Sequence, residues 1–300
     1  MKRLLGCLCL LSACAFAQTG VTPSRSERIA TLQDTRINES SGLARSLRDP
    51  ETFWTINDSG GEPCVFAIDI HGHTRAKVRL PNAVNFDWED LCGGLDEKNK
   101  PVLYIGDIGD NFRVRQTVQI YRIPEPELVP DGARAPEIAS VAPVVWHVSY
   151  PDGPHNAEGL LVHPVTRRIH ILTKSDDGKS ALYAFPLQFE ADKPVVLEKI
   201  VAVTFTGHER VGKRVIDDRM CTGAAFSPDG SRLVASTYSS LYEWSLPKDL
   251  PMAEAMAKEP ARLVPDLLRQ LEAVCYGADS KTLWITSEHL PAPLVKVTRP

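Results

Sequence analysis

Five oxygen-bearing side chains recur along the chain in the same short sequence setting. Each is followed by a small or polar residue and then by an apolar residue that begins a β-rich run. A second run ends in a polar residue 16 to 18 positions later in each case. The five oxygen-bearing residues are Ser41, Glu89, Glu158, Thr222 and Glu272. Such regular spacing predicts one supersecondary unit used five times. If the units surround an axis, these five residues meet at its centre.

A central ring of this composition has a defined chemistry. Three carboxylates in a narrow channel repel one another, so they must raise their pKa values, pair with a cation or recede into solvent. Calcium, which takes six to eight oxygen ligands, suits the set best, and magnesium or manganese suits it less well. The alternative is that the five residues only begin strands and that water fills the channel.

The elements that must position this ring are short strands. After the N-terminal segment, alternating apolar runs are separated by Gly, Pro, Asn and Asp, a pattern typical of all-β proteins. Most units show four runs, but the last shows three, and residues 28–32 offer the missing one. We therefore predict a five-bladed β-propeller over residues 27–300, closed by an N-terminal strand. A six-bladed propeller is the alternative. Residues 124–140 and 206–220 are expected to be extra loop, and residues 252–258 a short helix.

In each blade the first strand runs away from the central ring and the second strand runs back toward it. The ends of the five second strands should therefore surround the metal. Asp58, Asp107 and Lys174 are the candidate catalytic residues there. The candidate ligand-binding residues are Asn57, Asp110, Asn111, His155, Asn156, Arg219, Tyr238 and Glu288. For any one of them, the alternative is a polar residue in a solvent-facing turn.

The ring order Ser, Glu, Glu, Thr, Glu resembles that of the calcium-activated nucleotidases, the apyrase family of five-bladed propellers. That family places Ser, Glu, Glu, Ser, Glu around one central calcium. The resemblance implies that Ser41, Glu89, Glu158, Thr222 and Glu272 are calcium ligands, with Thr222 replacing the second Ser. It covers five short segments and no contiguous stretch. The phosphate-handling Arg of the first blade is missing here, since residues 57–61 read Asn-Asp-Ser-Gly-Gly, and Lys174 alone stands where the family has adjacent arginines.

Three functions remain open from the sequence. One is a calcium-dependent hydrolase of phosphoesters or phosphoanhydrides, with Asp58 or Asp107 as general base and Lys174 and Arg219 on the phosphate. Another is a glycan-active enzyme that uses Asp58, Asp107 and Glu288 as acid and base. The last is a non-catalytic propeller with a structural cation that binds a small polar or anionic ligand or a partner.

The N-terminus predicts export. A basic start, an apolar stretch and Ala15-Phe16-Ala17 indicate a signal peptide over residues 1–17, followed by a linker over residues 18–26. Leu11-Ser12-Ala13-Cys14 also fits a lipoprotein box with a lipid anchor at Cys14. Either route leads to a periplasmic, secreted or outer-surface protein. Four cysteines remain after the leader, and they form two disulfides in one of three pairings or stay buried thiols. They are Cys64, Cys92, Cys221 and Cys275.

The bulk composition sets the remaining expectations. The formal net charge of −4 and the absence of basic runs argue against nucleic-acid binding. No apolar stretch after the leader approaches the roughly 20 residues of a membrane span. We expect the protein to act as a monomer.

Overall fold

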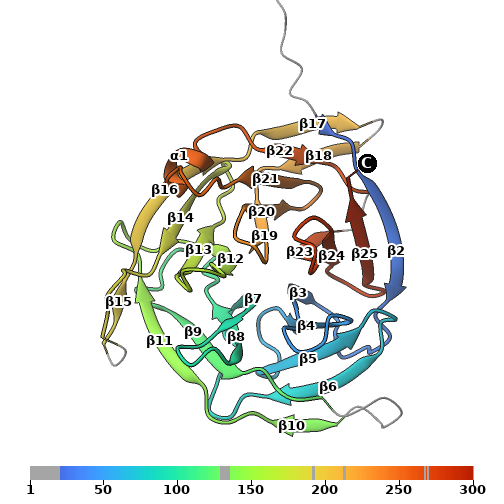
Figure 1. The fold of residues 1–300 in the computed structure, drawn as a ribbon, viewed down its shortest axis with the longest axis vertical. Coiled ribbons are helices and arrows are strands. Elements are labelled where there is room, and N and C mark those ends of the chain that lie inside the picture. Colours follow the sequence, from blue (N-terminus) through green and yellow to red (C-terminus); the bar gives the residue numbers. More distant parts are fainter. Residues whose placement is uncertain are drawn as a thin grey trace, which may run out of the picture.

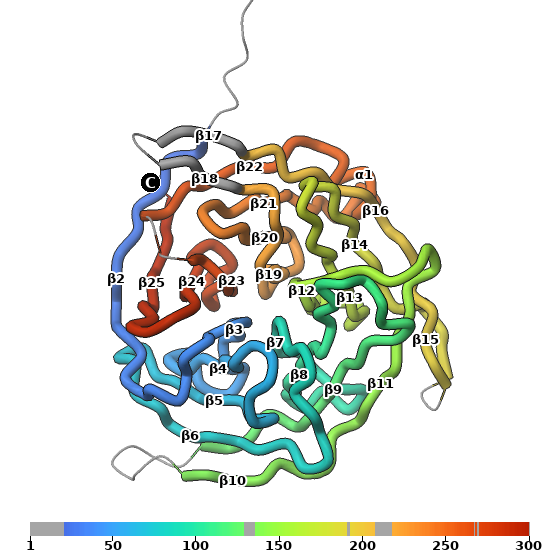
Figure 2. Tube along the Cα trace, turned by 180° about the vertical axis from the view of Figure 1, so that it is seen from behind, coloured from blue at the N-terminus to red at the C-terminus, as the bar shows by residue number. Residues whose placement is uncertain are grey.

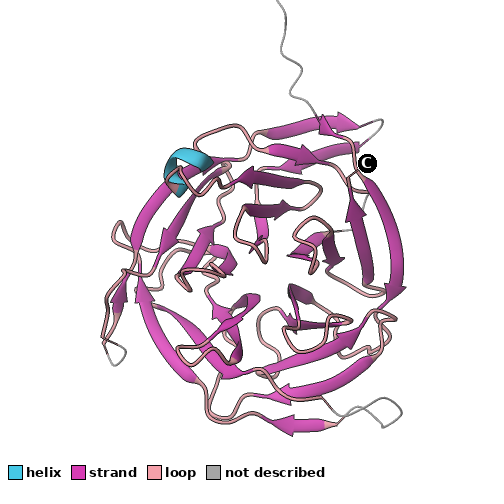
Figure 3. Ribbon diagram, viewed as in Figure 1, coloured by secondary structure: helices cyan, strands magenta, loops and turns pink. Residues whose placement is uncertain are grey.

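The computed structural model describes residues 21–128, 136–190, 193–211, 214–266, 268 and 270–299. The predicted signal peptide and Cys14 lie outside the described residues. Strands dominate, and one short helix, α1 (Met252–Met256), lies on the outside, near the predicted position (Figure 3). No helix in the described part is both long enough and apolar enough to cross a bilayer.

Five antiparallel blades surround a central axis, as predicted (Figure 1). Blade 1 contains β3 (Ser40–Arg45), β4 (Thr52–Asn57), β5 (Cys64–Asp69) and β6 (Thr74–Arg79). Blade 2 contains β7 (Trp88–Leu95), β8 (Pro101–Asp107), β9 (Val118–Pro124) and β11 (Val144–Ser149). Blade 3 contains β12 (Ala157–Val162), β13 (Ile169–Thr173), β14 (Lys179–Ala184) and β16 (Glu198–Thr204). Blade 4 contains β19 (Cys221–Phe226), β20 (Arg232–Thr237), β21 (Leu241–Ser245) and β22 (Ala261–Leu263).

The fifth blade joins the two ends of the described chain. It contains β23 (Leu271–Tyr276), β24 (Leu283–Ser287) and β25 (Pro293–Thr298). Its outer strand is β2 (Arg25–Thr31), which pairs antiparallel with β25. The predicted closure by an N-terminal strand is therefore confirmed, and the chain forms five blades instead of six. Figure 2 shows β2 running beside β25 from the opposite side.

Three blades carry an additional outermost strand that the sequence did not reveal. These strands are β1 (Val21–Thr22), β10 (Glu137–Ala139) and β15 (Val195–Val196). Each pairs parallel with the outer strand of the preceding blade, β22, β6 and β11 respectively. They cover edges whose free backbone groups would otherwise be open to pairing with another chain. The expected loops thus carry structure, because residues 206–220 also contain a hairpin of β17 (Gly207–Val211) and β18 (Arg214–Asp218).

The hydrophobic core lies between neighbouring blades. Between blades 1 and 2, Trp54 and Ile56 on β4 and Trp88 on β7 are fully buried with Ile105 on β8. The rings of Trp88 and Tyr121 lie 5.8 Å apart between centroids. Inward-facing residues alternate along each strand, so both faces of a blade contribute to the packing.

The four cysteines among the described residues are free thiols. Cys64, Cys221 and Cys275 are buried, and Cys92 is half-buried. Of the alternatives left open by the sequence, the structure shows the buried thiols and none of the three disulfide pairings.

Candidate functional site

All five ring residues occupy the second position of an inner strand. Each inner strand also has a break in register at this point, with one residue left out of the pairing ladder. A β-bulge bends the strand and redirects the bulged side chain. In blades 2 to 5 the bulged residue is the ring residue itself. In blade 1 it is Gly42, whose φ of 70° and contact with the backbone of Leu91 leave no room for a side chain.

The densest part of the mouth is a cluster of three carboxylates, which we call the acidic triad: Asp58, Asp87 and Glu89. One oxygen from each lies within 4.8 Å of the other two. Asp58 follows β4, and Asp87 and Glu89 lie two residues apart at the start of β7. Burial and then the neighbouring charge of Asp58 raise the pKa of Asp87 to about 6. Burial, followed by repulsion from Glu158 and Asp58, raises the pKa of Glu89 well above its usual value.

A lysine supplies positive charge on the other side of the mouth. The Lys174 ammonium donates hydrogen bonds to a Glu158 carboxylate oxygen and, at 2.9 Å, to the Tyr238 hydroxyl. The Lys174 side chain is only 11% exposed. Burial, the largest single effect, lowers its pKa, but charge attraction and hydrogen bonding from Glu158 and Tyr238 together outweigh burial, so the pKa of Lys174 is raised. The pKa of Glu158 still rises to about 7, because burial exceeds the stabilisation by Lys174.

Blade 5 adds a carboxylate pair bridged by an amide. Gln270 donates from Nε2 to Glu272 Oε1 at 2.5 Å and also to a Glu288 carboxylate oxygen. Burial raises the pKa of Glu272 well above its usual value, and burial also raises the pKa of Glu288. The bridge holds two ring-side carboxylates close together without adding positive charge.

The two hydroxyl residues of the ring join neighbouring blades. Ser41 donates its hydroxyl proton to the backbone carbonyl of Glu89, from blade 1 to blade 2. Thr222 donates to the backbone carbonyl of Leu271 at 2.9 Å, from blade 4 to blade 5. Both side chains therefore link neighbouring inner strands, and their oxygens keep lone pairs for another contact.

A more deeply buried carboxylate lies next to the ring. Asp90, next to Glu89 on β7, is 2% exposed. It accepts backbone N–H hydrogen bonds from Leu91 and Leu160, both at 2.8 Å, and from Ala224. Burial raises the pKa of Asp90 despite these hydrogen bonds. One side chain thus links the inner strands of blades 2, 3 and 4.

Asp107 lies in a different place from the one expected. It pairs directly with Trp88, whereas Asp58, Lys174 and Glu288 each lie one residue beyond the equivalent pair. A one-residue offset turns a side chain to the opposite face of the sheet. Asp107 accordingly forms an ion pair with Arg115 at 2.7 Å and lines a separate pocket of about 510 Å³.

Several predicted loop residues build the rim. Asn156 Oδ1 accepts the backbone N–H of Asp110 at 2.7 Å, and Asn156 Nδ2 donates to Asn111 Oδ1 at 3.1 Å. Asp110 also accepts the backbone N–H of Arg115 at 2.7 Å. These contacts fix the loop that follows β8, so they shape the mouth.

The other predicted loop residues lie further out. The Asn57 side chain donates to the backbone carbonyl of Arg36 at 2.6 Å. His155 Nε2 lies 3.0 Å from an Asp152 oxygen and 3.0 Å from the Tyr183 hydroxyl. Arg219 packs beside Gly178 in the turn between β13 and β14.

Sequence reasoning missed Asp87, Asp90 and Gln270. Asp87 had a usable signal, because residues two apart on a strand share a face and Glu89 was already a ring candidate. Gln270 likewise precedes Glu272 by two. Asp90 had no usable sequence signal, because a strand residue adjacent to a ring position is expected to point into the blade.

Comparisons with known proteins support the architecture. No protein-family model matches the chain, and no curated protein matches it by sequence. A soluble aldose sugar dehydrogenase from Escherichia coli has 12% identity and a TM-score of 0.50, covering 93% of this chain and all of that one. A gluconolactonase from Xanthomonas campestris has 13% identity and a TM-score of 0.47, covering 94% and 99%. The WD40 repeats of RRP9 have 10% identity and a TM-score of 0.47, covering 92% and 100%.

These similarities concern the fold. The identities of 10–13% are too low to carry an activity from those proteins to this chain. The expectation of a propeller is confirmed, while none of the three is a nucleotidase. The chain is an all-β, five-bladed propeller with an acidic mouth at one end of its axis.

Proposed function

We propose that the acidic mouth binds a divalent cation, preferably Ca²⁺, and that the protein is an exported, metal-assisted hydrolase of phosphoesters or phosphoanhydrides. The main support for the cation site is that one carboxylate oxygen from each residue of the acidic triad lies within 4.8 Å of the other two. Two oxygens bound to one Ca²⁺ at about 2.3–2.6 Å lie at most about 4.6–5.2 Å apart. The triad therefore fits one ion without rearrangement of the backbone.

The electrostatics of the mouth also favour a cation. Burial and mutual repulsion raise the pKa values of Asp87, Glu89, Glu158 and Glu272. A divalent ion among them relieves this repulsion, because opposite charge stabilises the ionised carboxylates. Lys174 offsets part of the negative charge, but it is directed to Glu158 rather than to the triad.

The residues around the triad have separate roles in this proposal. When bound, the cation polarises a phosphoryl oxygen and offsets phosphate charge. Lys174 donates a charge-assisted hydrogen bond to a non-bridging phosphate oxygen. Asp58, half-buried and with its pKa raised by burial, takes the proton of the attacking water. Asp107 is left out of this scheme, because it is paired with Arg115 in the separate pocket.

A second candidate is a non-catalytic propeller pinned by the cation. Glu158 and Lys174 already form an ion pair, so these two charges of the mouth are neutralised without a bound substrate. A glycosidase is less favoured. Asp107, one of its three candidate carboxylates, is ion-paired with Arg115 and lines a separate pocket.

The test begins with cation binding by the mature chain. Ca²⁺ and Mg²⁺ are titrated into metal-free protein by calorimetry, and the melting temperature is followed in parallel. We expect Ca²⁺ to bind and to raise the melting temperature, and Asp87→Asn to weaken binding at least tenfold. Asp176→Asn is the matched control. Asp176 is exposed, and it lies in the turn after β13, at the same end of the propeller as the mouth. Unchanged Ca²⁺ affinity in Asp87→Asn would rule out the triad site.

Turnover is then measured as phosphate release from nucleotides, phytate and simple aryl phosphates, with Ca²⁺ or with chelator. Calcium-dependent release by wild type supports the hydrolase, and its loss in Asp58→Asn at a Ca²⁺ concentration that saturates the variant supports Asp58 as the base. Calcium binding without release from any of these compounds supports the non-catalytic propeller instead.

A further inference from the structure

A second pocket lies toward the ends of the inner strands opposite the acidic mouth. Asp90 accepts backbone hydrogen bonds from Leu91, Leu160 and Ala224, and Leu91 and Ala224 also line this pocket. We call the space the lower pocket: it has a volume of about 410 Å³ and is lined by the far ends of all five inner strands. Its volume lies within the range of small-molecule sites.

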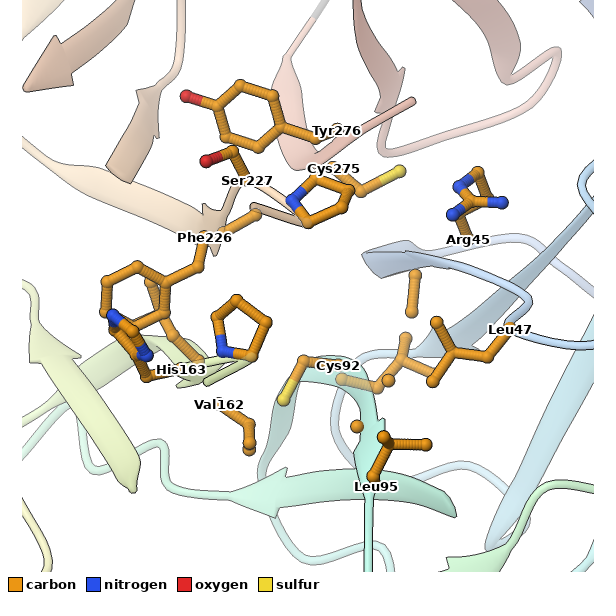
Figure 4. A pocket seen from close by; sticks show the side chains of 18 of the residues that line it. Arg45, Leu47, Cys92, Leu95, Val162, His163, Phe226, Ser227, Cys275 and Tyr276 are labelled. Atoms are coloured by element: carbon orange, nitrogen blue, oxygen red, sulfur yellow. The ribbon is translucent and has the colours of Figure 1, made fainter. Parts of the chain in front are cut away.

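The walls of the lower pocket are mainly apolar. Figure 4 shows Leu47, Leu95, Val162, Phe226 and Tyr276 arranged around a common space. Leu47 is 44% exposed and stands at the opening. Such walls favour an apolar molecule, because its burial removes hydrocarbon from water.

The charged groups of the lower pocket are positive. Arg45 and Arg167 line it, and no Asp or Glu is among its lining residues. Burial lowers the pKa of His163, which is therefore neutral near pH 7. This is the opposite of the mouth, where carboxylates predominate.

Arg45 has unused hydrogen-bonding capacity. Its Nε is shielded from solvent and has no acceptor among the described residues. Its Nη1 makes a long contact of 3.4 Å with the backbone carbonyl of Ser46. Within the described ranges, Arg167 donates only to neutral oxygens, the backbone carbonyl of Asp96 at 2.9 Å and the Asn99 side chain. A buried, unpaired guanidinium donor is costly unless an acceptor meets it.

We propose that the lower pocket binds a small amphipathic carboxylate, with its hydrocarbon part against the apolar walls and its carboxylate on Arg45. The planar guanidinium matches a carboxylate with two parallel hydrogen bonds. The same walls without Arg45 would accept a neutral or cationic amphiphile equally well. This site lies beyond the cation chemistry of the mouth and does not depend on it.

The test uses octanoate, octanol and octylamine as probes of equal chain length. We expect octanoate to bind most tightly by calorimetry and octylamine not to bind. Arg45→Met keeps a hydrocarbon stem and should weaken octanoate about 10- to 100-fold. Arg79→Met, at an exposed arginine on β6, is the matched control and should bind like wild type.

A steric variant makes the test independent of charge. A Cβ at Gly93 would lie 3.5 Å from the Arg45 carbonyl oxygen and 3.8 Å from Leu47 Cγ, so Gly93→Leu places a side chain at the opening. It should abolish octanoate binding while the melting temperature stays close to wild type. Calcium or chelator should leave octanoate affinity unchanged. Equal affinity for octanoate and octanol, or wild-type octanoate binding by Arg45→Met, would overturn the proposal.

Discussion

Gly109 allows a steric test of the cation site that leaves every charge in place. It follows β8 and packs against the acidic triad. A methyl group at this position would lie 2.3 Å from Glu89 Oε1 and 2.4 Å from Asp87 Oδ2. Gly109 does not have a positive φ, so alanine is compatible with the backbone there. Gly109→Ala therefore perturbs the two carboxylates and little else.

The size of the effect follows from these distances. Ordinary van der Waals contact begins near 3.4 Å, so each carboxylate must retreat by about 1 Å. Calcium–oxygen distances vary by only about 0.3 Å, and the displaced oxygens cannot both remain ligands. We expect at least a tenfold loss of Ca²⁺ affinity. At a Ca²⁺ concentration about 100 times the wild-type Kd, wild type gains about 2.7 kcal/mol, or roughly 5 °C in Tm, and the variant loses much of this gain.

The assay is calorimetric titration together with melting curves with Ca²⁺ and with chelator. Without Ca²⁺, the variant should melt close to wild type, since only the ends of flexible side chains move. Gly61→Ala is the matched control, because its new Cβ would lie an ordinary 3.7 Å from Asn85 Nδ2. Wild-type Ca²⁺ affinity in Gly109→Ala would show that Asp87 and Glu89 do not bind the ion together.

Three further predictions test other parts of the channel. Asp90→Ala leaves three buried backbone amides without an acceptor and should cost about 3 kcal/mol or more in urea unfolding; a wild-type midpoint would contradict the linking role of Asp90. Lys174→Met removes a positive charge from the mouth and should tighten Ca²⁺ binding severalfold while lowering any phosphate release; weaker Ca²⁺ binding would count against the proposed electrostatics. Burial, then repulsion from Arg168, lowers the pKa of His170 to about 3, below its usual 6.5. The unfolded state therefore binds a proton first, and stability attributable to His170 falls by about 1.4 kcal/mol per pH unit as pH drops from 6.5 towards 3. His170→Gln should lose this slope relative to wild type in urea unfolding measured between pH 7 and 4.

The five blades could be predicted because each inner strand begins with the same short sequence pattern. The ring residue, the small or polar residue after it and the following apolar run form a unit that can be recognised without knowledge of its neighbours. The closing strand β2 was also predictable, because blade 5 lacked an outer run. By contrast, β1, β10 and β15 pair with a neighbouring blade, and such pairing depends on the path of the chain in space.

The site was only partly predictable for a similar reason. Spacing identified Glu89, Glu158 and Glu272, but it gave Asp107 the wrong face, since side-chain direction on a strand reverses with each residue. To predict the ion pair between Lys174 and Glu158, one would have needed to know both that Lys174 ends its strand near Glu158 and that its side chain points toward the central axis. Asp90 could not be recognised, because its partners are backbone amides of other blades.

The pairing of β2 with β25 has a consequence for synthesis. Because β2 precedes the inner strands of all five blades and its partner β25 follows them, the circle cannot close until every blade has been synthesised. Bringing two such distant segments together is entropically expensive, although the expense grows only slowly with the length between them. A nascent chain that stops short of β25 would leave blade 5 without its outer pair. Ring closure thus favours chains that have reached β25 over chains that stop earlier.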